Sequence, residues 1–273
     1  MRTQVGIIGA GPAGLMLAHL LRRAGIESII VENRSREYCE ARVRAGLIEQ
    51  WARDMLIETG VGERLKAEGL FHKGIKLQFD GVLHEIKFTE LVGKGTTIYG
   101  QQEVVKDLID DLLRHGVPIL FEVSGTRVSD LDTKLPKIHF THDGKAQQIE
   151  CDFIGGCDGF HGICRPSVPD GKLTFYDREY PFGWLGILSE SANVDEELIY
   201  SYHDRGFALY TQRSPTVSRL YFQCAPDEDA GNWTDEAIWE ELRLRLGGVC
   251  PLPTGPILQK GVTPMRSFVT EPM

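Results

Sequence analysis

A glycine pattern near the N-terminus constrains the fold of this chain more than any other feature. The sequence GAGPAG at 9–14 follows a short apolar run at 4–8 and opens a stretch of helical periodicity from 12 to about 24. A second apolar run, 28–31, comes directly afterwards. Strand, tight turn, helix and strand thus fit into about thirty residues, which predicts a parallel βαβ unit.

The spacing of the glycines predicts a ligand for this unit. Gly9 permits a tight turn, Gly11 lets the backbone approach a pyrophosphate, and Gly14 lets the helix pack closely against the strand. The helix N-terminus then faces the phosphates. Glu32 lies 18 residues after Gly14, at the end of the second strand, where it can accept hydrogen bonds from ribose hydroxyls. We therefore expect dinucleotide binding; a glycine-rich turn without a ligand is the alternative.

A basic segment follows the second strand. Arg34, Arg36, Arg42 and Arg44 lie within residues 33–44 of an otherwise acidic chain. Guanidinium groups bind phosphate oxygens in a bidentate manner, so this cluster is a candidate phosphate site. A solvated charged loop is the alternative interpretation.

The remainder of the chain alternates between two kinds of pattern. Helical periodicity returns over 102–114, and 153–156 is a candidate buried strand. From Leu173 onward, short aromatic-rich runs separated by turn residues predict an antiparallel sheet, to which a hairpin around Gly81 is expected to belong. The expected segments are Leu77–Phe79, Val82–Phe88, Trp184–Leu188, Glu197–Tyr202, Phe207–Gln212 and Arg219–Cys224, then a helix over Asp235–Leu246 capped by Thr234 or Asp235.

These patterns predict an α/β protein. We expect a Rossmann-like nucleotide-binding domain with an interleaved, mainly antiparallel β-sheet domain, rather than two consecutive domains. The expected nucleotide-domain segments are 1–74 and 98–175. The expected segments of the β-sheet domain are the hairpin at 75–97 and residues 176–273, which include a return toward the nucleotide domain.

The composition of the chain restricts its expected binding partners and its cellular location. The chain has 273 residues and a net charge of −9 without a basic block, so nucleic acid is not an expected partner. The apolar N-terminal run is broken by glycines and too short to span a bilayer, so no membrane association is expected. Scattered cysteines indicate reduced thiols and a cytoplasmic protein; they are Cys39, Cys151, Cys157, Cys164, Cys224 and Cys250.

The stretch GCDGFHGICR at 156–165 looks at first like a metal site. Cys157, Asp158, His161 and Cys164 fall within it. A structural zinc site, however, usually takes four ligands in tight pairs at tetrahedral reach, and this spacing does not offer them. We expect no metal, and interpret the stretch as a cofactor loop.

Several motifs in order resemble those of the single-component flavin aromatic hydroxylases, and the resemblance runs over essentially the whole chain. The motifs are GAGPAG (9–14), RVRAG (42–46), YGQQEV (99–104), GCDGFHG (156–162), YPFGWLG (180–186), RGFALYTQRS (205–214) and RSFVTEPM (266–273).

The resemblance implies that the Rossmann-like domain binds FAD and that the interleaved β-sheet domain binds substrate. It also implies NADPH as a second cofactor. Arg44 corresponds to a residue on the FAD pyrophosphate and Gln102 to one near the ribityl chain, with Arg42 beside them. Asp158 belongs to a motif that supports the groove shared by FAD and the nicotinamide cofactor. Residues 33–38 correspond to the segment that selects between NADPH and NADH, and basic residues there favour NADPH; the residues concerned are Arg34, Arg36 and Tyr38.

The resemblance also implies a substrate site for a small aromatic acid. Thr211 and Arg213, two apart on a strand, are expected to face one side and to hold a carboxylate together with Tyr221. The family has serine where this chain has Thr211, so the hydroxyl is kept. Tyr200 is expected to contact the phenol oxygen. Arg213 is expected to be the only cation on this face, because Arg219 is assigned to the flavin.

The implied activity is hydroxylation of 4-hydroxybenzoate at the 3-position, giving 3,4-dihydroxybenzoate with O₂ as co-substrate. NADPH reduces FAD, a flavin C4a-hydroperoxide forms, and the ionised phenol attacks it. His72 corresponds to the solvent end of a proton relay through Tyr200. Arg219 is expected to act beside the flavin as a movable positive charge. A homodimer is expected for the full-length enzyme.

Two alternatives stay open. The chain could be a sister hydroxylase of another phenolic acid, such as 3-hydroxybenzoate, or a non-catalytic FAD-binding fragment. The family pattern continues beyond Met273 with a second FAD motif, so a truncated chain is also expected. Such a chain should bind FAD loosely and hydroxylate substrate negligibly.

Overall fold

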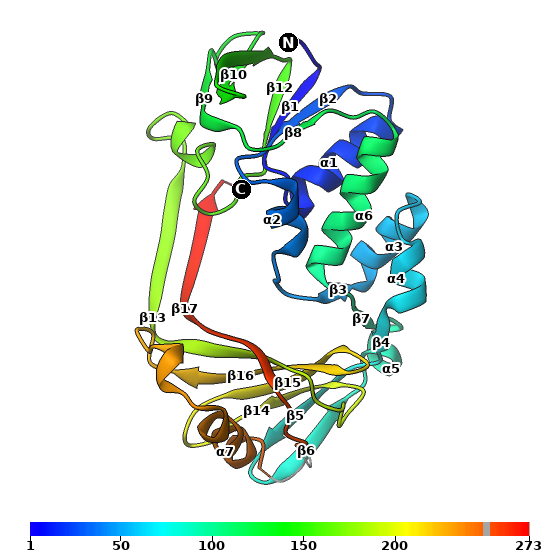
Figure 1. Ribbon diagram of the computed structural model, residues 1–273, viewed down its shortest axis with the longest axis vertical. Coiled ribbons are helices and arrows are strands. Elements are labelled where there is room, and N and C mark those ends of the chain that lie inside the picture. The colour runs from blue at the N-terminus through cyan, green and yellow to red at the C-terminus, as the bar shows by residue number, and fades with distance from the viewer. Residues whose placement is uncertain (248–251, 273) are drawn as a thin grey trace. The chain divides into compact units, whose positions relative to one another are not determined.

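The computed structural model describes residues 1–247 and 252–272, and the chain folds into two compact units (Figure 1). Unit 1 comprises Met1–Ala45, Asp54–Glu68 and Gly100–Leu173, and unit 2 comprises Gly46–Arg53, Gly69–Tyr99 and Thr174–Met273. Cys250 lies outside the described residues. These units are defined by packing, whereas the functional domain limits expected from the sequence remain predictions.

Unit 1 is built on a parallel sheet in the order β12-β1-β2-β8. Each residue of β1 and β2 is buried, because helices or other segments cover both faces of a parallel sheet. The predicted βαβ unit is thereby confirmed. The strands are β1 (Val5–Ile8), β2 (Ser28–Val31), β8 (Ile119–Leu120) and β12 (Phe153–Gly156).

Two helices of unit 1 pack against each other, α1 (Pro12–Arg23) and α6 (Gln101–Arg114), and α1 also packs on β1 and β2 (Figure 1). Proline is favourable at the first position of α1, where no backbone donor is needed, and Arg22 and Arg23 complement the helix dipole in its last turn. The buried stripe of α6 includes Val105, Leu108 and Leu112 at helical spacing. Both helices were expected.

A small antiparallel sheet, β11-β10-β9, completes unit 1. Ile138, Phe140 and Ile149 from it are almost fully buried in the same core as residues of β1 and β2. Asp143 and Gly144 form the turn between β10 and β11, both with positive φ, as a tight hairpin requires. Its strands are β9 (Ser124–Ser129), β10 (Lys137–His142) and β11 (Lys145–Glu150).

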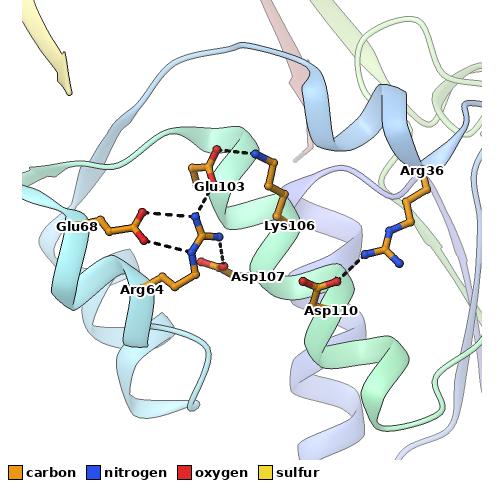
Figure 2. A network of polar contacts seen from close by, with 7 residues as sticks. All are labelled: Arg36, Arg64, Glu68, Glu103, Lys106, Asp107 and Asp110. Atoms are coloured by element: carbon orange, nitrogen blue, oxygen red, sulfur yellow. Dashed lines mark hydrogen bonds and ion pairs between the residues drawn. The ribbon is translucent and has the colours of Figure 1, made fainter. Parts of the chain in front are cut away.

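Acidic side chains on α6 anchor two short helices (Figure 2). Arg64 of α4 pairs with Glu103 at 2.6 Å and Asp107 at 2.7 Å, while Arg36 of α2 pairs with Asp110 at 2.5 Å. Such half-exposed pairs contribute about 0–1 kcal/mol each, so they fix orientation more than stability. The shorter helices are α2 (Arg36–Ala41), α3 (Gln50–Glu58) and α4 (Glu63–Glu68).

Unit 2 contains a large sheet in the order β17-β13-β16-β15-β14-β5-β6. Its pairs are antiparallel except for β14 with β5. The predicted antiparallel sheet and its hairpin are therefore confirmed, although the second hairpin strand ends at Ile86 rather than Phe88. The strands are β5 (Ile75–Phe79), β6 (Val82–Ile86), β13 (Thr174–Ser189), β14 (Leu198–Ser201), β15 (Ala208–Ser214), β16 (Val217–Cys224) and β17 (Ile257–Glu271).

One face of this sheet packs on α7 (Asp235–Arg245), which begins after Thr234 (Figure 1). The Thr234 hydroxyl accepts a hydrogen bond from the Ala237 backbone N–H, at 3.2 Å, so Thr234 is the N-cap. Tyr210 and Phe222 from the sheet are fully buried in this core.

A second small sheet, β3-β7-β4, also belongs to unit 2. No helix within residues 1–247 and 252–272 is both long enough and apolar enough to cross a bilayer. The remaining elements are β3 (Leu47–Glu49), β4 (Leu70–His72), α5 (Phe88–Val92) and β7 (Thr96–Ile98).

Candidate cofactor and substrate sites

The glycine turn of unit 1 leaves no room for side chains at two positions. Gly9 has φ of +107°, and a Cβ there would lie 2.4 Å from the Cys157 carbonyl oxygen. A Cβ at Gly14 would lie 2.0 Å from the Gly9 carbonyl oxygen. At Gly11, by contrast, nothing lies within 4 Å of the Cβ position, so the backbone is open to a ligand.

The Glu32 carboxylate ties the glycine turn to the end of β2. Its two oxygens accept hydrogen bonds from the backbone N–H of Ala10, at 2.7 Å, and of Arg34, at 2.9 Å. An ionised carboxylate has about four acceptor positions. Glu32 can therefore hold the turn and still accept a hydrogen bond from a ribose hydroxyl.

The start of α6 joins the segment that carries Arg44. The Gln101 N–H donates to the Ala45 carbonyl oxygen at 3.1 Å. Arg44 and Gln102 each lie one residue from this bond, on an exposed segment and in the first turn of the helix respectively. Chain connectivity thus brings the two expected FAD contacts into one region.

The basic residues of 33–44 have different surroundings. Arg36 is held by Glu40 and Asp110, each at 2.5 Å. The guanidinium groups of Arg34 and Arg42 lie over the Tyr38 ring, 5.1 and 5.8 Å from its centre. The charge of Arg36 is partly neutralised by these two carboxylates, whereas Arg34 and Arg42 stack on an exposed aromatic ring.

The loop after β12 is closed on itself by Asp158. Its carboxylate accepts a hydrogen bond from the Cys164 N–H at 2.9 Å, and a Cβ at Gly162 would lie 2.0 Å from its Cγ. Burial raises the pKa of the Cys157 thiol, and burial with Asp158 raises that of Cys164 to about 12. Protonated thiols are poor metal ligands. In the described part of the chain, no three His, Cys, Asp or Glu side chains form a group that could hold a metal ion.

Unit 1 therefore offers the features of a dinucleotide site. The N-terminus of α1 has no side-chain cap, its backbone is open at Gly11, and Arg42 and Arg44 of the same unit are exposed. Unpaired backbone donors at a helix N-terminus attract anionic phosphates. The residues present fit FAD.

In unit 2, strand register brings expected substrate residues to one face of the large sheet. Leu209 of β15 pairs with Tyr200 on one side and with Tyr221 on the other, while Thr211 pairs with Arg219. Residues directly opposite in a sheet share a face. These side chains therefore lie opposite the core face that packs on α7, because Tyr210 and the other core residues alternate with them.

This register corrects one expectation. Arg219 lies directly across from Thr211, so Arg213 is not the only cation associated with that face. The Arg219 Nε donates a hydrogen bond to the Tyr221 hydroxyl, and the guanidinium lies 4.9 Å from the centre of the same ring. The assumption was wrong because cross-strand register cannot be read from one strand.

Arg213 lies at an irregularity of β15. The pairing with β16 shifts between Gln212 and Ser214. A bulge of this kind interrupts strict alternation, so the argument that residues two apart share a face does not extend to Arg213. Its role in binding a carboxylate stays a prediction.

Aromatic rings border the same face. The Trp184 ring stacks on the Phe207 ring, with 5.2 Å between the ring centres, and its centre lies 5.7 Å from that of Tyr221. The ring centres of Phe207 and Tyr200 are 5.8 Å apart. A Cβ at Gly186 would lie 3.0 Å from the Tyr221 ring, so glycine makes room for that ring. Trp184 and Phe207 were not among the expected site residues, although the YPFGWLG and RGFAL motifs contain them.

The two residues expected to form the proton relay, Tyr200 and His72, are both affected by burial of their side chains. Burial raises the pKa of the Tyr200 phenol. His72 is only 1% exposed, which corrects its expected position at solvent. His72 is directly opposite Thr96 of β7, and Glu197 Oε2 lies 3.8 Å from its Nδ1.

Comparison with known proteins identifies the family of this chain. A family model described as an FAD binding domain matches residues 2–273. The p-hydroxybenzoate hydroxylase of Acinetobacter baylyi is 46% identical over 276 residues, which cover 100% of this chain and 68% of that protein. The 6-methylpretetramide 4-monooxygenase of Streptomyces rimosus is 27% identical, over 65% of this chain and 44% of its own length.

Solved structures agree on the fold. The crystal structure of p-nitrophenol 4-monooxygenase from Pseudomonas putida has a TM-score of 0.79 at 15% identity, covering 99% of this chain and 70% of that one. The chain therefore belongs to the FAD-binding family of flavin-dependent aromatic monooxygenases. Within this family it is close in sequence to p-hydroxybenzoate hydroxylase.

Proposed function

We propose that this protein hydroxylates 4-hydroxybenzoate at the 3-position, with FAD as the bound cofactor and NADPH as the reductant. The observation that carries the proposal is the sheet face on which Tyr200, Thr211 and Tyr221 come together beside a cation. The 46% identity to a protein named p-hydroxybenzoate hydroxylase supports the choice of substrate.

The cofactor would be held by backbone and by arginine. The open N-terminus of α1 binds the pyrophosphate together with Arg44, Glu32 binds a ribose, and Gln102 contacts the ribityl chain. Asp158 keeps its loop in shape beside the cofactor groove. Bound FAD supplies hydride acceptance and oxygen transfer to the ring, for which protein side chains have no equivalent chemistry.

The protein would orient and activate the substrate. Arg213, with the Thr211 hydroxyl, binds the carboxylate, because a buried carboxylate requires a paired cation. Tyr200 takes the phenol proton toward His72, and loss of that proton raises electron density at the neighbouring ring carbon. The Trp184 and Phe207 rings exclude water from this face. Arg219 supplies positive charge near the reacting centre.

Selection of NADPH would depend on residues 33–38. Arg34 is exposed and would contact the 2′-phosphate. Arg36 already forms ion pairs with Glu40 and Asp110, so we assign it a smaller role than Arg34 in binding the 2′-phosphate. Tyr38 supports Arg34 by stacking. We also propose a homodimer and, from the free cysteines among the described residues, a cytoplasmic location.

A panel of hydroxybenzoates tests the function. The purified full-length enzyme is supplied with FAD, then NADPH or NADH, and cofactor oxidation and product are measured for each isomer. We expect 4-hydroxybenzoate to stimulate NADPH oxidation most and to give 3,4-dihydroxybenzoate. Stimulation by 3-hydroxybenzoate instead would indicate a sister hydroxylase, and binding of FAD without stimulation by any isomer would indicate a non-catalytic protein.

A further inference from the structure

His72 and Thr96 are two of the residues in unit 2 that have buried side-chain polar atoms without a hydrogen-bond partner. His72 is 1% exposed and neither of its ring nitrogens is hydrogen-bonded, and the Thr96 hydroxyl is likewise unpartnered. The two residues are directly opposite on β4 and β7, so they share a face. Unpartnered buried polar groups are costly and are usually retained for a reason.

A carboxylate reaches this pair from another part of the sequence. Glu197, just before β14, is buried, and its Oε2 lies 3.8 Å from His72 Nδ1. The carboxylate also accepts hydrogen bonds from the N–H groups of Lys73, at 2.8 Å, and Gly74, at 3.2 Å. These bonds hold Glu197 at the turn that connects β4 to β5. Its position beside the imidazole is therefore fixed by backbone.

The other charges around His72 are identifiable. Burial lowers the pKa of His72, and Glu197, Asp195 and Glu196 oppose that effect in this order. Asp195 is paired with Lys76 at 2.5 Å, and Glu196 is exposed. From β3, Glu49 is in register with Thr96. Glu197 is thus the buried carboxylate that faces the ring directly.

We propose that Glu197 is a positioning residue for His72. The carboxylate directs Nδ1 of the ring toward itself and leaves Nε2 to exchange the proton that the substrate phenol loses. This inference rests on the proposed function, because the proton it concerns is the phenol proton.

The step involves only a proton. The phenol O–H bond breaks, its electron pair stays on oxygen, and the proton passes through Tyr200 to Nε2 of neutral His72. The resulting imidazolium faces Glu197 with Nδ1, 3.8 Å from Oε2, and the negative charge of the carboxylate stabilises it. Release of the proton from Nε2 restores the neutral ring. Without the carboxylate, a buried imidazolium would be strongly disfavoured.

The test compares Glu197→Gln with Glu196→Gln, an adjacent exposed residue of the same charge. The His72 ring signal is titrated by NMR in histidine-labelled protein without substrate or flavin, and it is assigned from its loss in His72→Gln. We expect Glu197→Gln to lower the His72 midpoint by about 1 pH unit or more, as loss of an opposite charge within 4–6 Å does. Glu196→Gln should change it much less.

A kinetic measurement links the contact to the reaction. After a pH jump, ionisation of bound 4-hydroxybenzoate is followed by phenolate absorbance. We expect it to be about tenfold slower in Glu197→Gln, since a pKa lower by one unit reduces the cationic population tenfold. Glu197→Asp keeps the charge and should retain a midpoint above that of Glu197→Gln, which provides a second variant if the glutamine variant folds poorly.

The outcomes separate this inference from the proposed function. An unchanged His72 midpoint in Glu197→Gln would mean that the carboxylate only caps the turn, and the inference would be wrong. A lowered midpoint with unchanged phenol ionisation in both Glu197→Gln and His72→Gln would also overturn it. Failure of the parent protein to bind 4-hydroxybenzoate would instead contradict the proposed function, while the midpoint would still report on the contact.

Discussion

At the scale of single residues, the sequence indicates which residues are candidates for the site better than it indicates which residues lie next to one another. Tyr200, Thr211 and Tyr221 were expected together from motifs, and strand register places them on one face. The pairing of Arg219 with Thr211 and the irregularity at Arg213 could not be predicted, because both depend on how two strands align. His72 was expected at the solvent end of the relay, but it is buried, and its carboxylate neighbour Glu197 is distant in sequence.

The carboxylate anchor gives a prediction at this scale. We expect Arg213→Ala to weaken binding of 4-hydroxybenzoate by roughly 2–5 kcal/mol, because it removes one partner of a buried charge pair. Arg213→Lys should fall between this variant and the parent, since lysine offers a point charge without two parallel donors. Affinity for FAD should stay near the parent value. Substrate affinity is measured by equilibrium titration.

The neutral analogue 4-hydroxybenzamide provides the control. Its affinity should suffer much less than that of the acid in Arg213→Ala. Equal losses for acid and amide would show that Arg213 supports the sheet instead. An acid-specific loss in Arg219→Ala but not in Arg213→Ala would assign the carboxylate to Arg219, which also faces Thr211.

At the scale of elements, a buried ion network connects α7 to the candidate substrate face. Glu241 accepts hydrogen bonds from Arg245 at 2.8 Å and from Arg205 at 2.9 and 2.7 Å. Arg245 donates in turn to the carbonyl oxygens of Phe207 and Gln223. The network therefore holds the backbone of Phe207, whose ring contacts Trp184 and Tyr200.

Removal of the central carboxylate should destabilise the protein strongly. Glu241→Ala leaves the buried Arg245 cation without its carboxylate, which costs about 3–5 kcal/mol. Glu240→Ala, an exposed neighbour on the same helix, should change the unfolding free energy by less than about 0.5 kcal/mol. Denaturant unfolding at neutral pH measures both. Similar losses in the two variants would contradict a central role for Glu241.

The same network has a pH signature. Hydrogen bonding from Arg205 is the largest effect that holds the pKa of Glu241 below its usual value of 4.5. Because the pKa of Glu241 is lower in the folded state, its ionised carboxylate contributes fully to the free energy of unfolding above pH 4.5. This contribution is lost as the pH falls through the lower pKa of the folded state. The stability difference between parent and Glu241→Ala should therefore shrink in acid.

Elements differ in how far local sequence predicts them. β1, α1, β2 and α6 were predicted because their turn residues and periodicity agree with their burial. The polar strands β9 and β11 and the long strand β17 were missed, because their residues are largely exposed and alternate poorly. Such strands are defined by their partners in the sheet rather than by their own composition.

At the scale of the whole molecule, the interleaving was predicted but its extent was not. The chain passes between the units at 45/46, 53/54, 68/69, 99/100 and 173/174. Residues 46–53 and 69–74 were expected in the nucleotide domain, yet they pack in unit 2. The short strands β3 and β4 there depend on β7, a pairing that no local pattern specifies.

Ligand linkage gives a prediction for the whole chain. FAD that binds only the folded protein should stabilise it by about 2.7 kcal/mol at 100 times its Kd. We expect Arg44→Ala to lose more of this stabilisation than Arg34→Ala. Arg44 adjoins the residue that accepts the hydrogen bond at the start of α6, whereas Arg34 lies over the exposed Tyr38 ring. A tenfold weaker affinity would remove about 1.4 kcal/mol.

The positions of the tryptophans determine how the stabilisation by FAD is measured. Trp51, Trp184, Trp233 and Trp239 all lie in unit 2, whereas the residues expected to hold FAD lie in unit 1. Tryptophan fluorescence therefore reports on unit 2, and far-UV circular dichroism reports on both units. FAD should raise the midpoint of unfolding, followed by circular dichroism, in the parent and in Arg34→Ala. It should raise this midpoint less in Arg44→Ala. Equal midpoints and equal FAD retention on desalting in the two variants would show that Arg44 does not contact the pyrophosphate, because loss of such a contact must weaken binding to the folded state.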